Sequence, residues 1–281
     1  MTNCRGNAII TALMLVALVA SLGTLLQLQQ RQAINYSQSY FQQQNAFAAS
    51  TMVFAWATVQ LQAPQLQPQR QLFPEQHIVG GKLTGKIKDA QGSFNVNNLL
   101  DKKNISKFTR LILIVAPTTD PEEALQISTQ LHQHLQQAPL LGYFATLDEL
   151  CQYSELGPNL LQQLRPFLSV LPGIQPINVN TAPEPVLGTL GHQLDPGLIS
   201  EIINAREQNP FQSLTELQHR LHHSLLEDEV TTESRYFLIT ATLTLDQEPW
   251  ILYSLLARDG YTVEQPLRFN VKRVWQAWEP S

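Results

Sequence analysis

A long uncharged stretch near the N-terminus constrains this chain more than any other feature. No side chain between Arg5 and Arg31 carries a charge, and residues 8–26 are almost wholly apolar. A helix rises about 1.5 Å per residue, so residues 8–26 are just long enough to cross a hydrocarbon layer of about 30 Å. The sequence therefore predicts a single membrane-spanning helix at one end of the chain.

Three interpretations fit such a stretch. A cleaved secretory signal peptide should have an apolar region of roughly 7–15 residues and a small-residue cleavage site, whereas this run is longer and shows no clean site. A plain signal anchor fits the apolar span and Arg5. The third interpretation uses Gly6, which directly precedes the run behind a very short polar leader. A cut between Gly6 and Asn7 would then expose the start of the helix.

The same helix should continue beyond the membrane. Neither Pro nor Gly occurs from Thr24 to Ala63, so a helix starting at Asn7 would be on the order of 80 Å long. Its outer half is rich in Gln, and we expect its apolar positions to pack on a globular head. These positions are Tyr36, Tyr40, Phe47, Val53, Trp56 and Val59.

The rest of the chain predicts a sheet interrupted by helices. Pro64 to Pro74 reads as a linker, and alternating residues then predict an antiparallel sheet made of segments from both ends of the chain. The predicted strands are residues 77–79, 83–87, 94–96, 236–245, 250–258 and 267–271. With 43% hydrophobic and 15% charged residues, the composition fits a globular protein with one apolar segment.

The middle of the chain is helical and contains a repeat. Ala124, Ile127, Leu131 and Leu135 line one face of a predicted helix that follows Asp120. Residues 144–150 and 211–217 share the pattern F-x-[ST]-L-x-E-L, which includes a capping box. Residues 181–184 predict a third capping box, and Asp195-Pro196 opens a further helix.

Part of this block resembles helix-hairpin-helix modules, some of which bind DNA. The resemblance rests on residues 177–182, Arg206 and residues 210–211. Those modules hold a phosphate at a Gly-x-Gly turn, but residues 191–195 form a longer stretch that ends in an acid. The net charge of -5 also disfavours nucleic acid as a partner, so packing is the preferred role. A membrane-anchored DNA-binding or uptake protein remains the alternative.

Catalytic and metal-binding patterns are missing from the sequence. It contains no G-x-S-x-G, phosphate loop, Cys-x-x-Cys or His-Glu-x-x-His, so nothing supports a hydrolase, and we expect no enzyme. We expect the pairs His132/His134 and His222/His223 to be solvated, as well as the acidic residues 227–229. Cys4 would leave with the leader, which makes Cys151 a buried thiol with no disulfide partner.

The layout of leader, Gly, membrane helix and amphipathic extension resembles type IV prepilin-like proteins. Over essentially its whole length the chain resembles the K-type minor pseudopilins of bacterial type II secretion systems, the general secretion pathway protein K family. The specific pieces are Arg5-Gly6 before residues 7–10, Thr11, residues 92–99 and residues 177–182. The resemblance implies an α+β pseudopilin fold, in which a long transmembrane helix packs on an antiparallel sheet with a large inserted α-helical domain.

The resemblance also implies a division of the chain. We expect a leader over 1–6, an N-terminal helix over 7–63, a first sheet part over 64–118, an inserted helical domain over 119–233 and a second sheet part over 234–281. Gly6 and Asn7 would be the prepilin peptidase site, followed by methylation. Most pilins have Glu at the fifth mature position, where it pairs with the N-terminal amine of a neighbour; Thr11 stands here, which suits the tip of a pseudopilus.

The expected partners and location follow from the same resemblance. The partners would be the I- and J-type and possibly H-type minor pseudopilins, the major pseudopilin, the prepilin peptidase and the inner-membrane assembly platform, with no nucleic acid. The protein would cross the bacterial inner membrane once, with its head in the periplasm, and support export of folded proteins across the outer membrane. Family members bind calcium, but residues 101–141 lack the acidic segment typical of the family, so the residues suggest no calcium ligands and no cofactor is assigned.

Overall fold

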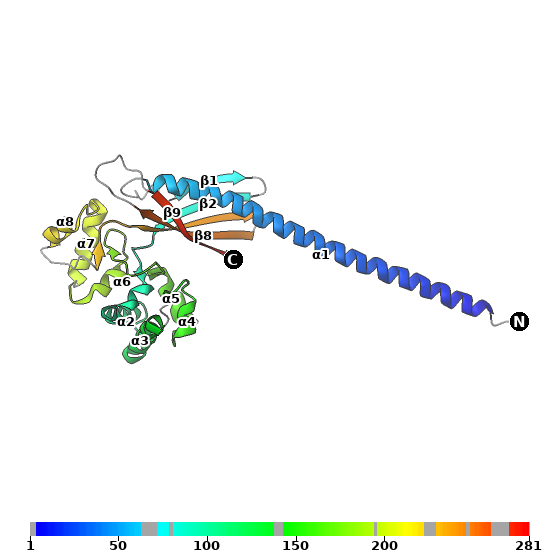
Figure 1. Ribbon diagram of the computed structural model, residues 1–281, viewed down its shortest axis with the longest axis horizontal. Coiled ribbons are helices and arrows are strands. Elements are labelled where there is room, and N and C mark those ends of the chain that lie inside the picture. The colour runs from blue at the N-terminus through cyan, green and yellow to red at the C-terminus, as the bar shows by residue number, and fades with distance from the viewer. Residues whose placement is uncertain are drawn as a thin grey trace.

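A long helix projects from a globular head in the computed structural model (Figure 1). The structure describes residues 4–62, 72–78, 81–137, 143–193, 196–221, 229–245, 248–259 and 270–280. Helix α1 runs without a break from Cys4 to Gln60, which confirms the prediction of one continuous helix. At the standard rise its 57 residues span about 85 Å, and most of that length lies outside the head.

The head contains a five-stranded antiparallel sheet in the order β1-β2-β7-β8-β9. Its strands are β1 (Leu72–Ile78), β2 (Gly81–Asp89), β7 (Tyr236–Leu245), β8 (Glu248–Asp259) and β9 (Asn270–Pro280). The first two strands come from before the helical block and the last three from after it. The predicted assembly of the sheet from both ends of the chain is therefore confirmed.

The last turns of α1 pack on one face of this sheet (Figure 1). Ala49, Val53, Phe54, Ala57 and Leu61 are buried there, against residues of β2, β7 and β8. The predicted apolar face of α1 was largely wrong. Of its members, Val53 is buried and Trp56 half-buried, whereas Tyr36, Tyr40 and Val59 are more than half exposed. The side chain of Phe47 lies outside the described residues.

Two predictions about the first sheet segment also need correction. Strand β1 already includes Leu72 to Pro74, which we assigned to a linker. Phe94 and Asn95 form the short strand β3, but it pairs in parallel with β4 (Leu168–Ser169) and stands outside the main sheet. The next residues, Val96–Leu100, form a 3-10 turn, because the Asn95 side chain accepts a bond from the Asn97 amide and caps it.

The helical block is inserted between β2 and β7 and has its own apolar core. It comprises α2 (Ile105–Val115), α3 (Pro121–Gln137), α4 (Glu149–Tyr153), α5 (Pro158–Leu164), α6 (Glu184–Leu187), α7 (Pro196–Gln208) and α8 (Leu214–Leu221), with 3-10 turns at Lys102–Asn104, Arg165–Phe167 and Gly188–Gln193. Since α2 packs against α3, the helical part begins before residue 119, where we had placed its start. The predicted core positions of α3 are all buried.

The block is built from two similar units. In the first, Asn97 donates to the carbonyl of Phe144 (3.1 Å) and accepts from its amide (2.8 Å). In the second, Asn180 makes the same two bonds with Phe211, at 2.8 and 2.9 Å. Each Asn follows a short strand of a parallel pair, β3 with β4 and β5 (Ile177–Asn178) with β6 (Val230–Thr231). The predicted sequence repeat thus marks a structural duplication.

The three predicted capping boxes behave differently. Ser213 accepts from the Glu216 amide at 3.1 Å, and Glu216 reaches back to the Gln212 amide at 2.8 Å, so this box is confirmed. At the first, Glu149 accepts from the Ala145 amide, but the Thr146 hydroxyl donates to Glu149 and caps no amide, so this box was only half right. The third prediction was wrong, because Pro183 and not Thr181 occupies the N-cap position of α6, where no side chain caps the helix.

Candidate assembly surfaces

The predicted processing residues lie at the start of α1. Gly6, Asn7 and Thr11 belong to its first turns and are continuous with the apolar segment that follows. Their side chains lie outside the described residues. The cleavage after Gly6 and the role of Thr11 at the fifth mature position therefore stay predictions.

The apolar segment of α1 is long enough to cross a membrane. It meets the length and composition of a span from Ala12 to Ile34, so it overlaps the predicted 8–26 and ends later. None of its side chains is buried in the protein. Apolar residues exposed by more than half surround the helix on all sides: Leu13, Met14, Leu15, Val16, Leu18, Val19, Leu22, Leu25 and Leu26. A helix that is apolar all round and has no protein cover is typical of a membrane anchor.

Two hydroxyls within this segment are paired inside the helix. The Ser21 hydroxyl donates to the carbonyl of Ala17 at 2.8 Å, and the Thr24 hydroxyl donates to that of Ala20 at 2.9 Å. Because these bonds stay within the helix, neither hydroxyl needs water in a hydrocarbon environment. The segment can therefore enter a bilayer without unpaired polar groups at these positions.

A second apolar surface follows α1 from the anchor onto the head. Met52 and Val59 are 50% and 61% exposed, and with the exposed Ala48 and Ala55 they form a line in which successive members are three or four residues apart. Seven residues before Ala48 stands Phe41, and seven before that Ile34, both more than half exposed. We call Ile34, Phe41, Ala48, Met52, Ala55 and Val59 the α1 stripe.

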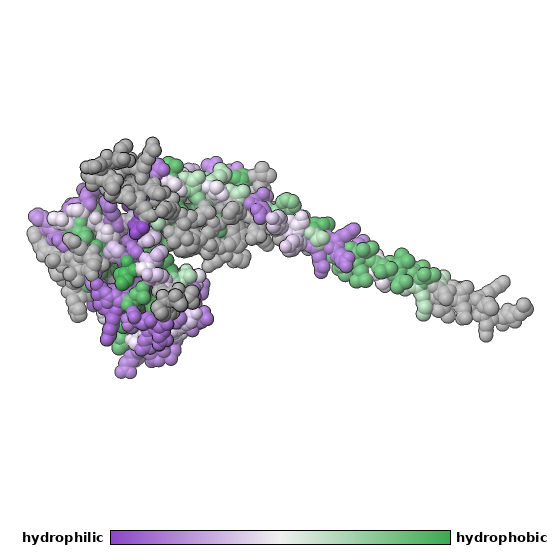
Figure 2. Space-filling view, in the orientation of Figure 1, coloured by the Kyte–Doolittle hydropathy of each residue, from purple (hydrophilic) through white to green (hydrophobic). Residues whose placement is uncertain are grey.

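The α1 stripe faces away from the sheet. With 3.6 residues per turn, Met52 and Val59 lie on the side of the helix opposite Val53 and Ala57, which are buried against the sheet. Figure 2 shows apolar surface along the projecting helix. Spacing of three and four residues along an apolar line is the pattern by which one helix packs against another.

Asp89, at the end of β2, joins the sheet to the inserted helical block. Its carboxylate accepts bonds from the hydroxyls of Thr181 (2.6 Å) and Ser234 (2.7 Å), from the Asn178 amide group (2.8 Å) and from the Gln91 backbone amide (2.9 Å). Burial raises the pKa of Asp89, and these four donors oppose that effect. This junction accounts for Thr181, whose hydroxyl serves Asp89 instead of capping a helix.

Gly92 makes the same junction possible. A Cβ there would lie 2.7 Å from the Thr181 hydroxyl and 3.0 Å from its backbone. Only glycine allows the two segments to come this close without displacement.

Several residues predicted to be solvated have structural contacts instead. His132 is half-buried and bonds the Leu99 carbonyl at 2.6 Å, and His134 stacks on Tyr153 with ring centroids 3.6 Å apart. Glu229 pairs with Lys107 at 2.7 Å, and its side chain is only 8% exposed. The predictions for these three residues were wrong, because single-residue polarity does not reveal a partner far away in the chain. His222, His223, Glu227 and Asp228 lie outside the described residues.

Arg206 and Cys151 also have structural surroundings. Arg206, part of the helix-hairpin-helix pattern, donates to the carbonyls of Val179 (2.6 Å) and Ala182 (2.7 Å), so its guanidinium is already engaged. Cys151 is a free thiol, half-buried where we expected full burial, and burial raises its pKa. Among the described residues no group of three His, Cys, Asp or Glu could hold a metal ion.

Sequence reasoning missed two of the features described above, the α1 stripe and the Asp89 junction. The α1 stripe has a signal in the sequence, since Ile34, Phe41, Ala48 and Ala55 recur every seven residues, but choosing it over the face that packs on the sheet requires the structure. The Asp89 junction has no local signal, because the side chains that bond to Asp89 lie 89 to 145 positions away.

Two sequence comparisons find similarity to the same family of secretion proteins. The model of the family "Type II secretion system (T2SS), protein K" matches residues 177–236, which cover the second helical unit. The type II secretion system protein K of Pseudomonas aeruginosa is 28% identical in an alignment 208 residues long, which covers 64% of this chain. The match spans 62% of that relative's length.

The head and helix also match a solved structure. The chain aligns with a chain from the crystal structure of the GspK-GspI-GspJ complex of the enterotoxigenic Escherichia coli type 2 secretion system. The TM-score is 0.65 at 18% identity, covering 88% of this chain and 99% of that one. At this identity the match establishes the shared fold. By sequence the chain is thus similar to type II secretion system protein K, and it shares the fold of the matched chain, in which a long helix packs on a sheet with an inserted helical domain.

Proposed function

We propose that this chain is a minor pseudopilin that forms the tip of a type II secretion pseudopilus together with I- and J-type minor pseudopilins. It is anchored in the inner membrane by α1, holds its head in the periplasm, supports export of folded proteins across the outer membrane and has no enzymatic activity. The solved relative with the same fold comes from a complex with GspI and GspJ, which supports this choice of partners.

The observation that carries the proposal is the α1 stripe. It continues from the membrane anchor along the outer side of the head, where no described residue of the protein covers it. An apolar line with heptad-like spacing on a helix already seated on its own sheet is suited to packing against a second helix. Sister pseudopilins would offer such a helix in a parallel orientation, since all are anchored in the same membrane.

Co-purification tests the proposal. The full-length protein is produced with the I- and J-type subunits of its own secretion system, extracted in mild detergent and captured by a tag on the partner. We expect the wild type to be retained. The amount of the variant Met52→Lys with Val59→Lys that is captured should fall at least about tenfold, since two ammonium groups would be buried between helices.

A matched variant adds the same two charges elsewhere on the head. Gln162→Lys with Gln163→Lys changes exposed positions on α5 and should be retained like the wild type. Equal retention of the stripe variant and the wild type would refute assembly through this surface. Resistance to a protease, equal in all three proteins, shows that the folds are intact.

A further inference from the structure

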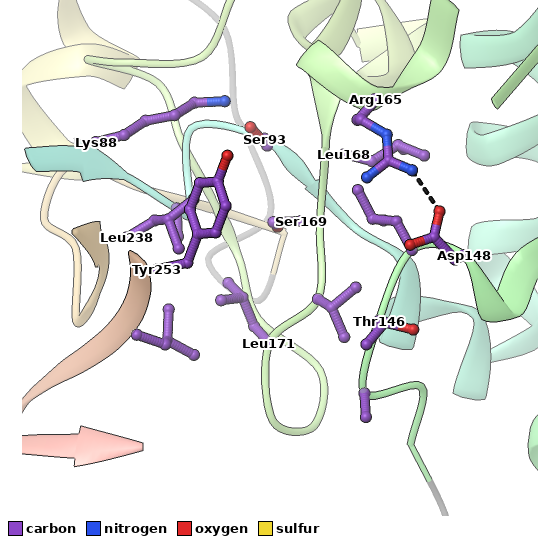
Figure 3. A pocket seen from close by; sticks show the side chains of 15 residues that line it. Lys88, Ser93, Thr146, Asp148, Arg165, Leu168, Ser169, Leu171, Leu238 and Tyr253 are labelled. Atoms are coloured by element: carbon purple, nitrogen blue, oxygen red, sulfur yellow. Dashed lines mark hydrogen bonds and ion pairs between the residues drawn. The ribbon is translucent and has the colours of Figure 1, made fainter. Parts of the chain in front are cut away.

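A pocket lies where the sheet meets the first helical unit (Figure 3), with a volume of about 340 Å³. Its walls are mostly apolar. Leu238, Tyr253 and Leu255 line it from β7 and β8, and Leu168 and Leu171 line it from the inserted block. The volume falls within the range of pockets that bind small ligands or single peptide anchors.

In Figure 3 two cations lie along the upper edge of the pocket, Lys88 at its left and Arg165 at its right. Lys88 is half-buried, and its ammonium donates to the Pro166 carbonyl at 3.2 Å. Among the described residues no carboxylate forms an ion pair with it. Burial and the neighbouring Lys86 lower the pKa of Lys88, and the nearby carboxylate of Asp89 opposes that effect. Arg165 is paired with Asp148, so the rim holds two positive groups and one negative group.

A buried hydroxyl lacks a partner in the wall of the same pocket. The oxygen of Ser169 is shielded from solvent and makes no hydrogen bond, the one buried side-chain polar atom of this kind among the described residues. Leaving such a group unpaired costs free energy, which a ligand with a donor or acceptor at that depth would recover. An alkyl chain would leave the hydroxyl unpaired, whereas a peptide backbone offers both kinds of group.

We propose that this pocket binds a short segment of a partner protein, which inserts an apolar side chain and sets a carboxylate against Lys88 and Arg165. The apolar walls accept the side chain, the excess of positive charge at the rim selects the carboxylate, and Ser169 bonds the backbone. This site is separate from the α1 stripe, so the two surfaces can act on different partners and can fail independently.

Binding of a labelled peptide tests the site. Full-length protein is placed in lipid nanodiscs, because free detergent would compete for an apolar pocket. The probe is a fluorescein-labelled tetrapeptide of alternating leucine and glutamate, and its counterpart carries glutamine in place of glutamate. Fluorescence anisotropy should show saturable binding of the glutamate peptide, at least about tenfold tighter than that of the glutamine peptide.

Variants of the pocket separate its parts. Lys88→Gln with Arg165→Gln should weaken binding of the glutamate peptide at least about tenfold, and Ser169→Leu should abolish it by filling the pocket. Lys102→Gln removes an exposed charge outside the pocket and should bind like the wild type. Unchanged thermal unfolding of each variant shows that the fold is retained.

Three results would overturn the proposal. They are the absence of saturable binding to the wild type, equal affinity for the two peptides, and pocket variants that bind like Lys102→Gln. A fourth result would also contradict a peptide site. If decanoate displaces the peptide and binds more tightly than the peptide does, the pocket is assigned to a lipid-like carboxylate instead.

Discussion

At the scale of single residues, one buried carboxylate joins three segments that are far apart in the chain. Asp89 ends β2, and it holds the start of the second helical unit through Asn178 and Thr181 and the return to β7 through Ser234. The chain leaves the sheet at Asp89 and comes back to it beside Ser234. Both crossings between sheet and insert therefore depend on this side chain.

The pH dependence of stability tests the state of Asp89. Its pKa is raised in the folded protein above the ordinary value of 3.8, so its contribution is complete below about pH 4 and is lost as pH rises through the folded pKa. Asp89→Asn removes this titration. We expect the wild type to exceed the variant in free energy of unfolding most at pH 4 and by less at pH 7.

All four tryptophans lie in α1, β8 and β9, so fluorescence during urea unfolding reports on the sheet. If the difference in free energy of unfolding between the wild type and Asp89→Asn grows with pH, the four hydrogen bonds outweigh burial and lower the pKa of Asp89.

Asn97 and Asn180, each of which bonds both the amide and the carbonyl of a phenylalanine, give a second prediction at this scale. We call these two contacts the asparagine clamps. Asn97→Ala and Asn180→Ala each leave a buried backbone amide and a carbonyl of Phe144 or Phe211 unpaired. Each should lower the free energy of unfolding by about 2–3 kcal/mol. Asn204→Ala, at an exposed position of α7, should change it by less than about 0.5 kcal/mol. Similar small effects at all three sites would show that the clamps are not structural.

At the scale of elements, the seat of α1 on the sheet depends on a close approach. A Cβ at Gly85 of β2 would run into the side chain of Val53 and lie 2.9 Å from the Cβ of Phe73. Glycine at this position lets the helix sit directly on the strand. This contact is one of those that hold the buried face of α1 against the sheet, so that the α1 stripe points outward.

The contact predicts a coupled pair of substitutions. Gly85→Ala should lower the free energy of unfolding by about 1–3 kcal/mol through overpacking. Val53→Ala should also destabilise the protein, by removing a fully buried side chain. In the double variant the new methyl fills the vacated space, so its loss should be smaller than the sum of the two. Urea unfolding of all four proteins gives the coupling, and strictly additive losses would contradict the packing.

Local patterns predicted these elements to different degrees. The single long helix, β7 and β8 follow from runs without breakers and from strict alternation, which depend on neighbouring residues alone. The pairing of Phe94 with Leu168 could not be predicted, because a two-residue parallel strand has no periodicity. The hydroxyl of Thr181 was assigned to a helix cap since that sequence fits one, whereas its partner Asp89 lies 92 positions away. Contacts between residues so far apart in the chain form the Asp89 junction, but they leave no signal in the local sequence.

At the scale of the whole molecule, the protein is a head on a long, exposed apolar stalk (Figure 1). The stalk between Ala12 and Ile34 has no cover from the described residues of its own chain, which is typical of a segment that lies in a bilayer. This arrangement explains why the head has a complete core of its own while the apolar part of α1 contributes nothing to it.

The central claim is that this stalk, freed at its start by a cut after Gly6, anchors the head in the membrane. The most direct measurement is the intact mass of the protein extracted from membranes of cells that contain a prepilin peptidase, with Gly6→Ala as the comparison. We predict a wild-type chain that begins at Asn7 with the mass of a methylated N-terminus, and a Gly6→Ala chain that keeps residues 1–6. A wild-type chain that begins beyond Ile34 and is found in the soluble fraction would contradict the account.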